Sequence, residues 1–356
     1  MNAKVVKIGD IFIGGNNPIR VQSMITSDAS DPVGCIKMIK KLEQYGCEIV
    51  RLSVLNMDGA KNISRIKDAV NVALVADIHF DYRLAIECVK QGIDKIRINP
   101  GNIGDEKKVR EVVKACKDKK IPIRIGVNCG SLKAIKKYDT SKWDKKRWAL
   151  EMVKEAEEEI KILKDLDFHD VVVSLKADDI ERTILANEIF ASKYDFPLHI
   201  GVTEAGTLIS GIVKSTIAIS YLLNNNIGST IRVSLTEDPI IEVRVAFEIL
   251  KALGLRNYGP NIISCPTCGR TQVNIVGIVK RLEEIIYSDP VLRKKSEGKK
   301  IAIMGCVVNG PGEAKQADFG ICGGKGKGVF IEKGKILKTI KESEWINEII
   351  RKIREF

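Results

Sequence analysis

Hydrophobic and polar positions alternate in two ways over the first two thirds of the chain. Short β-branched segments are each followed by a longer segment whose apolar residues recur at helical intervals, a pattern typical of a parallel α/β fold. Eight segments have the strand pattern, namely residues 19–24, 49–54, 73–79, 95–100, 121–128, 170–177, 197–204 and 230–236. Eight such units predict a closed (β/α)8 barrel of the TIM type. An open, doubly wound sheet is the alternative, but no Gly-x-Gly-x-x-Gly sequence follows the first strand to indicate a dinucleotide site.

Two connecting segments carry helix signals. Asp31 followed by Pro32 predicts an N-cap and a first-turn proline. Residues 145–166 have apolar positions at helical intervals on a charged background. Residues 131–144, just before this helix, form an insertion of the kind typical of a lid or a substrate loop.

Polar side chains gather at the carboxyl ends of the predicted strands, where TIM barrels carry their active sites. Residues an even number of positions apart share a face of a strand. The same-face pairs are Arg51 and Ser53, Asp77 and His79, Arg97 and Asn99, Arg124 and Asn128, Ser174 and Lys176, His199 and Thr203, and Arg232 and Ser234. Four arginines and a lysine would repel one another there, so the set favours an anion with several oxygens, such as a diphosphate. Any single one of these residues could instead form a salt bridge or cap a strand end.

One carboxylate, Glu204, follows the seventh predicted strand and should lie among these cations. We expect it to be ionised unless closure of the site removes it from water. It could neutralise an arginine or carry a proton to the substrate, and the sequence favours neither role.

The pattern changes near the sequence RNYGPN at residues 256–261, which is typical of a linker. We expect a barrel over residues 1–256 and a smaller α+β domain over residues 257–356.

Composition limits the cell compartment and the partners. No segment approaches the ~18 consecutive apolar residues of a membrane span. Gly9, Asp10 and Gly14 interrupt the start where a signal peptide needs an apolar core, so we expect a reducing, cytoplasmic location. The net charge of +12 predicts attraction to an anionic partner. Only 5% of the residues are aromatic and none interleave with a basic run, which argues against nucleic acid as that partner.

Three cysteines of the second domain lie in short loops. Cys265 and Cys268 form Cys-Pro-Thr-Cys, and Cys306 lies in the glycine-rich sequence MGCVVNGPGE after a predicted strand at 300–304. A thioredoxin-type pair is one interpretation, although the motif opens a tail rather than following a first strand. The other two are a structural zinc completed by Cys322, and a cubane iron–sulfur cluster with three thiolates and a non-cysteine fourth ligand.

The remaining cysteines are scattered through the barrel and predict ordinary small buried residues. They are Cys35, Cys47, Cys88, Cys116 and Cys129. The glycine-rich segment 323–328 lacks the Gly-Lys-Ser/Thr ending of a phosphate loop, so we expect a hairpin turn.

The motifs CPTCGR and MGCVVNGPGE, together with VQSM near the start and the strand-end residues, resemble the (E)-4-hydroxy-3-methylbut-2-enyl diphosphate synthase family, IspG or GcpE, in its two-domain form. The resemblance covers the whole chain. It implies reductive opening and dehydration of 2-C-methyl-D-erythritol 2,4-cyclodiphosphate on the non-mevalonate isoprenoid route, with ferredoxin or flavodoxin as electron donor. It also implies a 4Fe-4S cluster held by Cys265, Cys268, Cys306 and Glu313, in a domain similar to those of sulfite and nitrite reductases.

The resemblance further implies roles for the strand-end residues. The implied diphosphate ligands are Arg51, His79, Arg97, Asn99, Arg124, Asn128, Ser174, Lys176, Arg232 and Ser234. Glu204 would face the reacting carbons as acid or base, and Glu313 would be the second catalytic carboxylate. Family members form a head-to-tail homodimer in which one subunit's cluster domain caps the other's barrel. The sequence ITSDAS after Met24 replaces a threonine-rich run usual in the family, which leaves the contacts of that loop open.

Two other functions compete with this one. A zinc-stabilised basic tail could recruit nucleic acid to an enzyme barrel. A pterin-dependent barrel enzyme, such as a dihydropteroate synthase relative, would explain the barrel but leave the cysteines unused.

Overall fold

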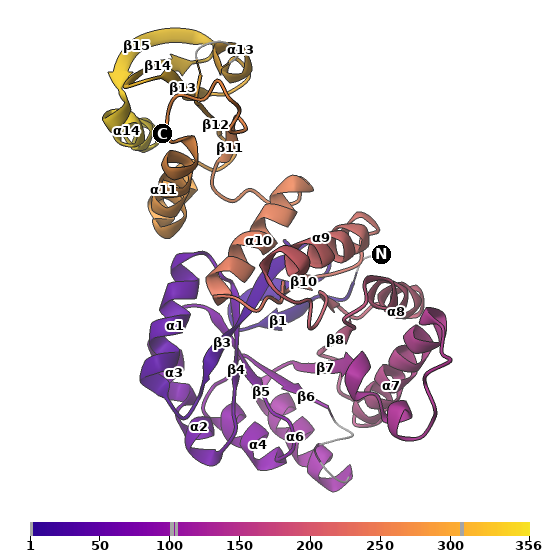
Figure 1. The fold of residues 1–356 in the computed structure, drawn as a ribbon. Helices are drawn as coiled ribbons and strands as arrows, with labels where there is room; N and C mark the ends of the chain where they lie inside the picture. The colour runs from indigo at the N-terminus through magenta and orange to yellow at the C-terminus, as the bar shows by residue number, and fades with distance from the viewer. Residues whose placement is uncertain (1–2, 100–102, 104–105, 307–309) are drawn as a thin grey trace. The chain divides into compact units, whose positions relative to one another are not determined.

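The computed structural model describes residues 3–99, 103, 106–306 and 310–356. The chain divides into two compact units, Met1–Arg256 and Asn257–Phe356 (Figure 1).

The first unit is built on a parallel eight-stranded barrel. Its strands are β3 (Arg20–Asp28), β4 (Ile49–Ser53), β5 (Ala73–Asp77), β6 (Lys95–Ile98), β7 (Ile123–Asn128), β8 (Val171–Lys176), β9 (His199–Ile200) and β10 (Thr230–Ile231). They pair in the order β8-β7-β6-β5-β4-β3-β10-β9, and a bridge between Val173 and Leu198 brings β8 beside β9. The barrel is therefore nearly closed, and the predicted TIM-type α/β fold is confirmed.

Two of the predicted strands are much shorter than the sequence indicates. Segments 197–204 and 230–236 keep only two paired residues each, in β9 and β10. Gly201 explains the end of β9, because its φ of +149° is a conformation that other residues rarely adopt. A Cβ there would lie 2.2 Å from the carbonyl oxygen of Arg232. The predicted strand 95–100 ends at Ile98, and Pro100 lies outside the described residues.

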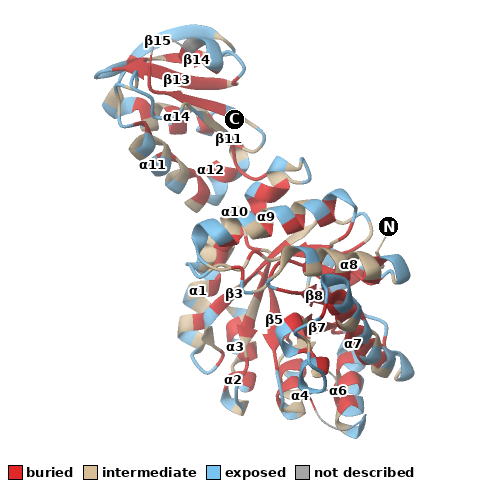
Figure 2. Ribbon diagram, turned by 45° about the vertical axis from the view of Figure 1, so that its right-hand side comes forward, coloured by how far each residue is buried: buried red, intermediate tan, exposed pale blue. Residues whose placement is uncertain are grey.

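Helices surround the barrel and bury the faces that pack on it, while their outer faces stay exposed (Figure 2). They are α1 (Pro32–Gln44), α2 (Met57–Lys61), α3 (Ile63–Asp68), α4 (Tyr82–Lys90), α6 (Glu106–Lys119), α7 (Lys145–Asp165), α8 (Ile180–Lys193), α9 (Leu208–Asn224) and α10 (Pro239–Ala252). Asp31 caps α1 as predicted, because its Oδ1 accepts a hydrogen bond of 2.9 Å from the Gly34 amide. Within the described residues, no helix has the length and apolar character needed to cross a membrane.

A short hairpin that the sequence did not predict covers one end of the barrel. It consists of β1 (Val6–Ile8) and β2 (Ile11–Ile13). Its buried side chains pack against Ile49, Ala73 and Val75, near the starts of β4 and β5. The hairpin therefore closes the amino-terminal end of the barrel with an apolar plug.

Two short 3-10 turns, η1 (Cys129–Ser131) and η2 (Lys133–Lys136), lie at the start of the insertion at 131–144. Trp143 packs edge-on against Trp148 of α7 at 5.1 Å between ring centroids, and Arg147 stacks over Trp143 at 4.6 Å. These contacts anchor the end of the insertion to α7. Its role as a lid or substrate loop stays a prediction.

The second unit is an α+β domain with a mixed five-stranded sheet, as predicted. Its strands are β11 (Asn261–Ser264), β12 (Lys300–Met304), β13 (Phe319–Gly324), β14 (Lys327–Glu332) and β15 (Lys335–Lys341), in that order across the sheet. The first three are parallel and the last two pair antiparallel. The likeness to sulfite and nitrite reductases stays a prediction.

The helical elements of the second unit are α11 (Ile275–Ser288), α12 (Pro290–Lys295), α13 (Gly310–Ala314), η3 (Glu342–Glu344) and α14 (Trp345–Arg354). Trp345 is fully buried in the core that the sheet forms with α11 and α14. The predicted hairpin turn is confirmed, because Gly324 pairs with Lys327 and leaves two turn residues, including Gly326 with a φ of +78°.

Candidate functional site

The register of the barrel strands brings an acid and two arginines side by side. Asp77 of β5 pairs with Arg97 of β6, and Arg97 pairs with Arg124 of β7. Paired residues of parallel strands face the same side of the sheet, so all three side chains belong to the barrel interior near its carboxyl-terminal mouth.

Asp77 is the acid that several of the predicted cations share. Its carboxylate lies 3.2 Å from Nη1 of Arg97, 3.7 Å from Nε of Arg51 and 3.6 Å from Nε2 of His79. Burial alone would raise the pKa of Asp77, but the His79 hydrogen bond and the arginine charges hold it well below its usual value. Asp77 is therefore ionised and fixes the positions of the cations around it.

Arg124 and Lys176 lie deeper and have no acid of their own. Arg124 is 2% exposed and Lys176 is 8% exposed. Nε and Nη1 of Arg124 are buried without a hydrogen-bond partner among the described atoms. Burial, followed by repulsion from neighbouring arginines, holds the pKa of each group well below its ordinary value. Around Arg124 and Lys176, basic side chains therefore outnumber acidic ones.

A second acid, Glu242 of α10, organises the opposite wall. It is buried and lies 3.4 Å from both Nε and Nη2 of Arg232. It also accepts hydrogen bonds from the Ser23 hydroxyl at 2.8 Å and the Leu235 amide at 3.0 Å. Glu242 was not predicted from the sequence, because this residue lies inside a helix rather than at a strand end.

Met24 links the two walls of the mouth. Its sulfur accepts hydrogen bonds from Nε and Nη2 of Arg51, at 3.1 and 2.8 Å, and lies 4.0 Å from Nη1 of Arg232. Burial lowers the pKa of Arg51 to about 10, an effect that Asp77 opposes and that Arg232 and Arg97 strengthen. Among the described residues, two acids, Asp77 and Glu242, face five basic side chains in the mouth, which are Arg51, Arg97, Arg124, Lys176 and Arg232.

The other predicted site residues have more varied surroundings. Asn99 is buried and its Oδ1 has no partner among the described atoms. Ser174 is buried and donates to the carbonyl oxygen of Ile125 at 3.3 Å. Asn128 and Ser234 are partly buried. Glu204 is exposed and has a φ of +51°, a left-handed conformation that is uncommon for a residue other than glycine.

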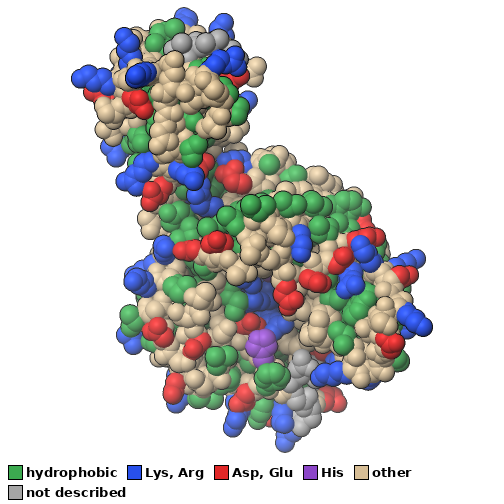
Figure 3. All heavy atoms as spheres, in the orientation of Figure 1, with side chains coloured by type: hydrophobic (Ala, Val, Ile, Leu, Met, Phe, Trp, Pro, Cys, Tyr) green, Lys and Arg blue, Asp and Glu red, His purple; other side chains and the backbone are tan. Residues whose placement is uncertain are grey.

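Gly126 keeps space open between the side chains of Arg97 and Ser174. A Cβ on Gly126 would lie 2.9 Å from Nε of Arg97 and 3.3 Å from Oγ of Ser174. Figure 3 shows Lys and Arg side chains gathered in a hollow of the barrel unit, with acidic and histidine side chains at its edge. The mouth can therefore bind a compact polyanion through several charge-assisted hydrogen bonds.

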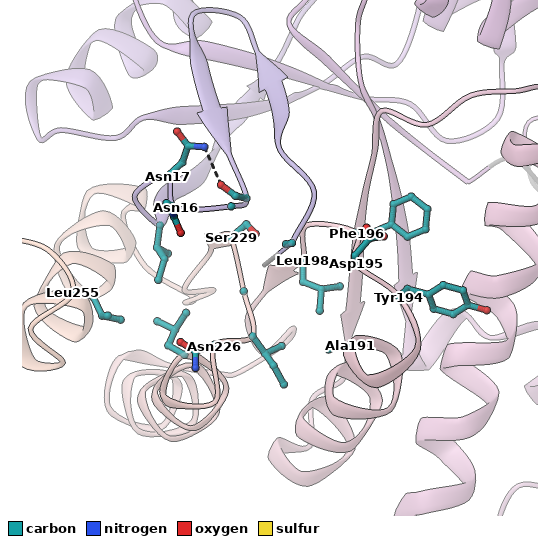
Figure 4. Close-up of a pocket in the computed structure, with 17 residues that line it drawn as sticks. Asn16, Asn17, Ala191, Tyr194, Asp195, Phe196, Leu198, Asn226, Ser229 and Leu255 are labelled. Carbon is teal, nitrogen blue, oxygen red and sulfur yellow. Dashed lines mark hydrogen bonds between the residues drawn. The ribbon is translucent and has the colours of Figure 1, made fainter. Parts of the chain in front are cut away.

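A separate hollow of about 350 Å³ lies among residues that precede the barrel strands (Figure 4). Asn16, Asn17, Asn226 and Ser229 line it, together with apolar side chains such as Leu198. No described lining residue is a lysine or an arginine. This hollow does not offer the charge that a diphosphate needs.

The cysteine loops of the second unit meet at the carboxyl ends of two paired strands. Ser264 of β11 pairs with Ile303 of β12, so Cys265 and Cys306 follow neighbouring parallel strands. The Gly305 amide donates a hydrogen bond of 3.2 Å to Sγ of Cys265. Such amide donation to sulfur is typical of thiolate ligands in iron–sulfur proteins.

Cys268 and Glu313 are the other two predicted cluster ligands. Cys268 is exposed, and a backbone hydrogen bond at Arg270 is the main cause of the lowered pKa of its thiol. Glu313 is exposed on α13, next to the undescribed residues 307–309. In the part of the chain that the structure describes, no three His, Cys, Asp or Glu side chains are already arranged to hold a metal ion.

Cys322 lies beneath these loops in β13. Burial is the main cause that raises the pKa of its thiol to about 12, and Cys265, Cys306 and Glu313 add to it through their charges. All four groups therefore lie within electrostatic reach of one another. This donor set fits a thiolate-rich cluster in its chemistry. The five barrel cysteines are buried, as predicted.

Two family models match the chain. The GcpE TIM-barrel domain matches residues 3–247, and the GcpE protein C-terminal domain matches residues 261–355. A protein of Thermodesulfovibrio yellowstonii named 4-hydroxy-3-methylbut-2-en-1-yl diphosphate synthase (flavodoxin) is 52% identical, with 98% of this chain and 97% of that protein covered. The Clostridium perfringens protein of the same name is 49% identical, with 97% and 96% covered.

Solved structures resemble the barrel unit in fold alone. A dihydropteroate synthase from Coxiella burnetii matches with a TM-score of 0.52 and 13% identity, over 71% of this chain and 99% of that chain. A dihydropteroate synthase from Yersinia pestis matches with a TM-score of 0.52 and 10% identity, over 70% of this chain and 98% of that chain.

Proposed function

The chain belongs to the GcpE family, whose models and curated relatives match it over nearly its full length, and we propose its function on this basis. The chain is a 4-hydroxy-3-methylbut-2-en-1-yl diphosphate synthase. It opens and dehydrates 2-C-methyl-D-erythritol 2,4-cyclodiphosphate reductively, on the non-mevalonate route to isoprenoids. The substrate assignment rests on the composition of the barrel mouth, where five basic side chains face two acidic ones among the described residues.

The cyclic diphosphate supplies the negative charge that this mouth lacks. We assign the deepest contacts to Arg124 and Lys176, because their polar atoms are buried and have no acid of their own. The ligand set is Arg51, His79, Arg97, Asn99, Arg124, Asn128, Ser174, Lys176, Arg232 and Ser234. Asp77 and Glu242 position the arginines rather than contact the substrate, because their oxygens are already engaged by cations.

We assign a 4Fe-4S cluster to Cys265, Cys268, Cys306 and Glu313. The hydrogen bond from the Gly305 amide to Cys265 supports the assignment, as do Cys265, Cys306 and Glu313, which all lie within electrostatic reach of Cys322. When bound, the cluster would supply the two electrons of the reaction one at a time. Glu313 would be the weaker ligand in this set, because its donor is a carboxylate rather than a thiolate.

Glu204 is assigned to proton transfer at the substrate. Its carboxylate is exposed to solvent at the end of the barrel that carries the cations, on a backbone with a positive φ. Strained backbone conformations of this kind are found most often at functional positions. Exposure lets the side chain exchange protons with water before the site closes.

The proposed function is tested by anaerobic purification followed by metal analysis and assay with the cyclic diphosphate. We expect a brown protein that contains iron and forms the linear diphosphate when a reductant is present. A colourless protein that contains zinc would support the structural-zinc interpretation instead. An iron protein that leaves the cyclic diphosphate unchanged would contradict the substrate assignment.

The electron donor is proposed to be flavodoxin, after the names of the relatives. An acidic donor would be attracted to a chain with a net charge of +12. We therefore expect the rate of reduction by flavodoxin to fall as salt rises from about 50 to 500 mM, because the Debye length shortens over that range. A small uncharged reductant is the control, and equal salt dependence for both reductants would contradict electrostatic docking.

A homodimer is proposed in which one subunit's cluster domain caps the other's barrel. Helix α9 supports the dimer, because Ile209, Val213, Ile217 and Tyr221 form a stripe at four-residue spacing with 45–78% exposure. Lys214 is the helix's single charged residue, so a second copy would meet little repulsion there, and symmetric i±4 ridges can interdigitate.

We expect Ile217→Glu to produce a monomer on analytical ultracentrifugation, because it places a charge within the apolar stripe. Glu181→Gln, at an exposed position of neighbouring α8 away from the stripe, is the control and should leave the mass unchanged. A dimeric Ile217→Glu variant would exclude α9 as the interface. We also propose a cytoplasmic location, since no disulfide joins the described cysteines.

A further inference from the structure

A second layer of polar side chains lies inside the barrel, below the cations of the mouth. Lys95 of β6 is two residues before Arg97, so both side chains leave the same face of the strand. His199 of β9 and Gln22 of β3 belong to the same interior. Lys95 and His199 are 0% exposed and Gln22 is 1% exposed.

These buried groups lack the partners that buried polar atoms normally have. Nζ of Lys95, both amide atoms of Gln22 and Nε2 of His199 find no hydrogen-bond partner among the described atoms. Nδ1 of His199 lies 2.8 Å from the hydroxyl of Thr230, which leaves only Nε2 free to face the interior.

The charges around Lys95 are mostly positive. Arg124 of β7 and Arg51 of β4 repel it, and the charge of Lys95 in turn lowers the pKa of His199 of β9. Asp94 is the one acid among the described residues within its electrostatic reach, and it is already engaged by the Lys67 ammonium and by the Leu74 amide at 2.7 Å. Asp77 of β5 is likewise held by Arg97 and Arg51.

An ammonium ion in this position would be buried without an acceptor and among like charges, which strongly favours the neutral amine. Burial first, and then Arg124 and Arg51, hold the pKa of Lys95 well below its ordinary value. The pKa of His199 is lowered in the same direction by burial and then by Lys176, Arg124, Lys95 and Arg51.

We infer that Lys95 is uncharged in the free enzyme and binds one proton when the cyclic diphosphate enters the mouth, an inference that rests on the proposed function. The two phosphate charges offset Arg124 and Arg51, the arginines that repel Lys95, so the field at Nζ opposes a proton less. One N–H bond forms at Nζ, the proton comes from solvent, and no other bond changes in this step.

A protonated Lys95 would stabilise the negative charge that the reaction produces. Two electrons and one proton convert the cyclic dianion into the linear trianion and one water. The ring C–O bond breaks and its oxygen stays on the diphosphate, which gains a negative charge. A charged Lys95 below Arg97 offsets that charge as it develops. Lys95 is thus a positioning residue that acts through the arginines.

Calorimetry on the oxidised holoenzyme tests the inference without turnover. The probe is the cyclic diphosphate, whose two phosphate groups each carry a single strongly acidic hydroxyl and therefore exchange no proton near neutral pH. Titrations at pH 8 in buffers of different ionisation enthalpy give the number of protons bound. We expect an uptake of about one proton, and an association constant that falls up to about tenfold for each pH unit above neutrality.

Two lysine variants assign the proton. Lys95→Met should remove about one proton of uptake while the substrate still binds. Lys90→Met, at an exposed position of α4, should leave the uptake unchanged. His199→Gln should keep most of the uptake, which separates Lys95 from its neighbour. Lys95→Gln repeats the test with a polar replacement, in case the methionine variant folds poorly.

The outcomes separate this inference from the function on which it rests. Tight binding by the wild-type enzyme with no proton uptake would overturn the inference and leave the proposed substrate in place. Unchanged uptake in both Lys95 variants would also overturn it. An absence of binding by the wild-type enzyme would overturn the substrate assignment and the inference together.

Discussion

Replacing Cys306 with alanine is expected to leave the purified protein without iron and to reduce turnover to background. Cys306 is the buried thiol that follows β12, beside the β11 end that carries Cys265. Without it the loops keep only the adjacent pair and a carboxylate, which is too few thiolates for a cubane cluster. The loss should exceed the 10- to 100-fold that removal of an outer-shell partner typically costs. Iron content, visible absorption and anaerobic turnover provide the measurements.

Glu313→Ala should separate cluster retention from activity. Three thiolates remain, so we expect this variant to keep more iron than the Cys306 variant yet to lose most of its turnover. Cys116→Ala, a small change in the barrel core, is the matched control and should retain both iron and activity. Full activity in the Glu313 variant would contradict its assigned role, and iron retained by Cys306→Ala would contradict the proposed ligand set.

Lys176→Met and Arg97→Met are expected to weaken substrate binding more than they slow the chemical step. Each removes a charge-assisted contact to phosphate worth about 1.5–3 kcal/mol, so KM should rise about 10- to 100-fold while kcat changes less. The Arg97 variant also removes a cation from Asp77, so its effect should be the larger of the two.

Steady-state kinetics under anaerobic conditions measure both effects, and thermal unfolding shows whether the variants remain folded. Lys193→Met is the control for charge, because this lysine lies on the surface of α8 and pairs with Glu157 at 3.0 Å. An unchanged KM in both site variants would mean that these cations support the barrel structure rather than bind the substrate.

The sequence predicts the barrel well because its strands are buried on both faces and therefore stand out as β-branched segments. All eight appear where the pattern places them. Their ends are less predictable, since β9 stops where Gly201 adopts a positive φ that composition does not reveal. The β1–β2 hairpin was missed because three-residue strands contain too few positions to show alternation.

The cations of the site could also be predicted, because they fall at alternate positions near strand ends. The acids that hold them could not. Glu242 lies within a helix and reaches Arg232 only through tertiary packing. Lys95 sits at the start of its strand, where a lysine is normally read as solvated, and only its complete burial shows otherwise.

The cysteine loops show a third kind of limit to prediction from spacing. Counting thiols suggested Cys322 as a fourth ligand, whereas the family resemblance pointed to Glu313. The structure places Cys322 beneath the loops in β13, next to Gly310, whose Cβ would lie 3.5 Å from the Cys322 sulfur. Choosing between the two donors requires chemistry on the protein itself, which the Glu313 variant supplies.

The apolar plug formed by β1 and β2 covers the amino-terminal end of the barrel interior. Val6, Ile8 and Ile13 form one apolar cluster with Ile49, Ala73, Val75 and Val172 at this end, so the polar groups of the interior lie between that cluster and the carboxyl-terminal mouth. Lys95 lies next to this cluster, because it pairs with Val75 of β5. The proton must therefore reach its Nζ as the ring enters, and the Nζ protons of the substrate complex should exchange with solvent more slowly than those of the free enzyme.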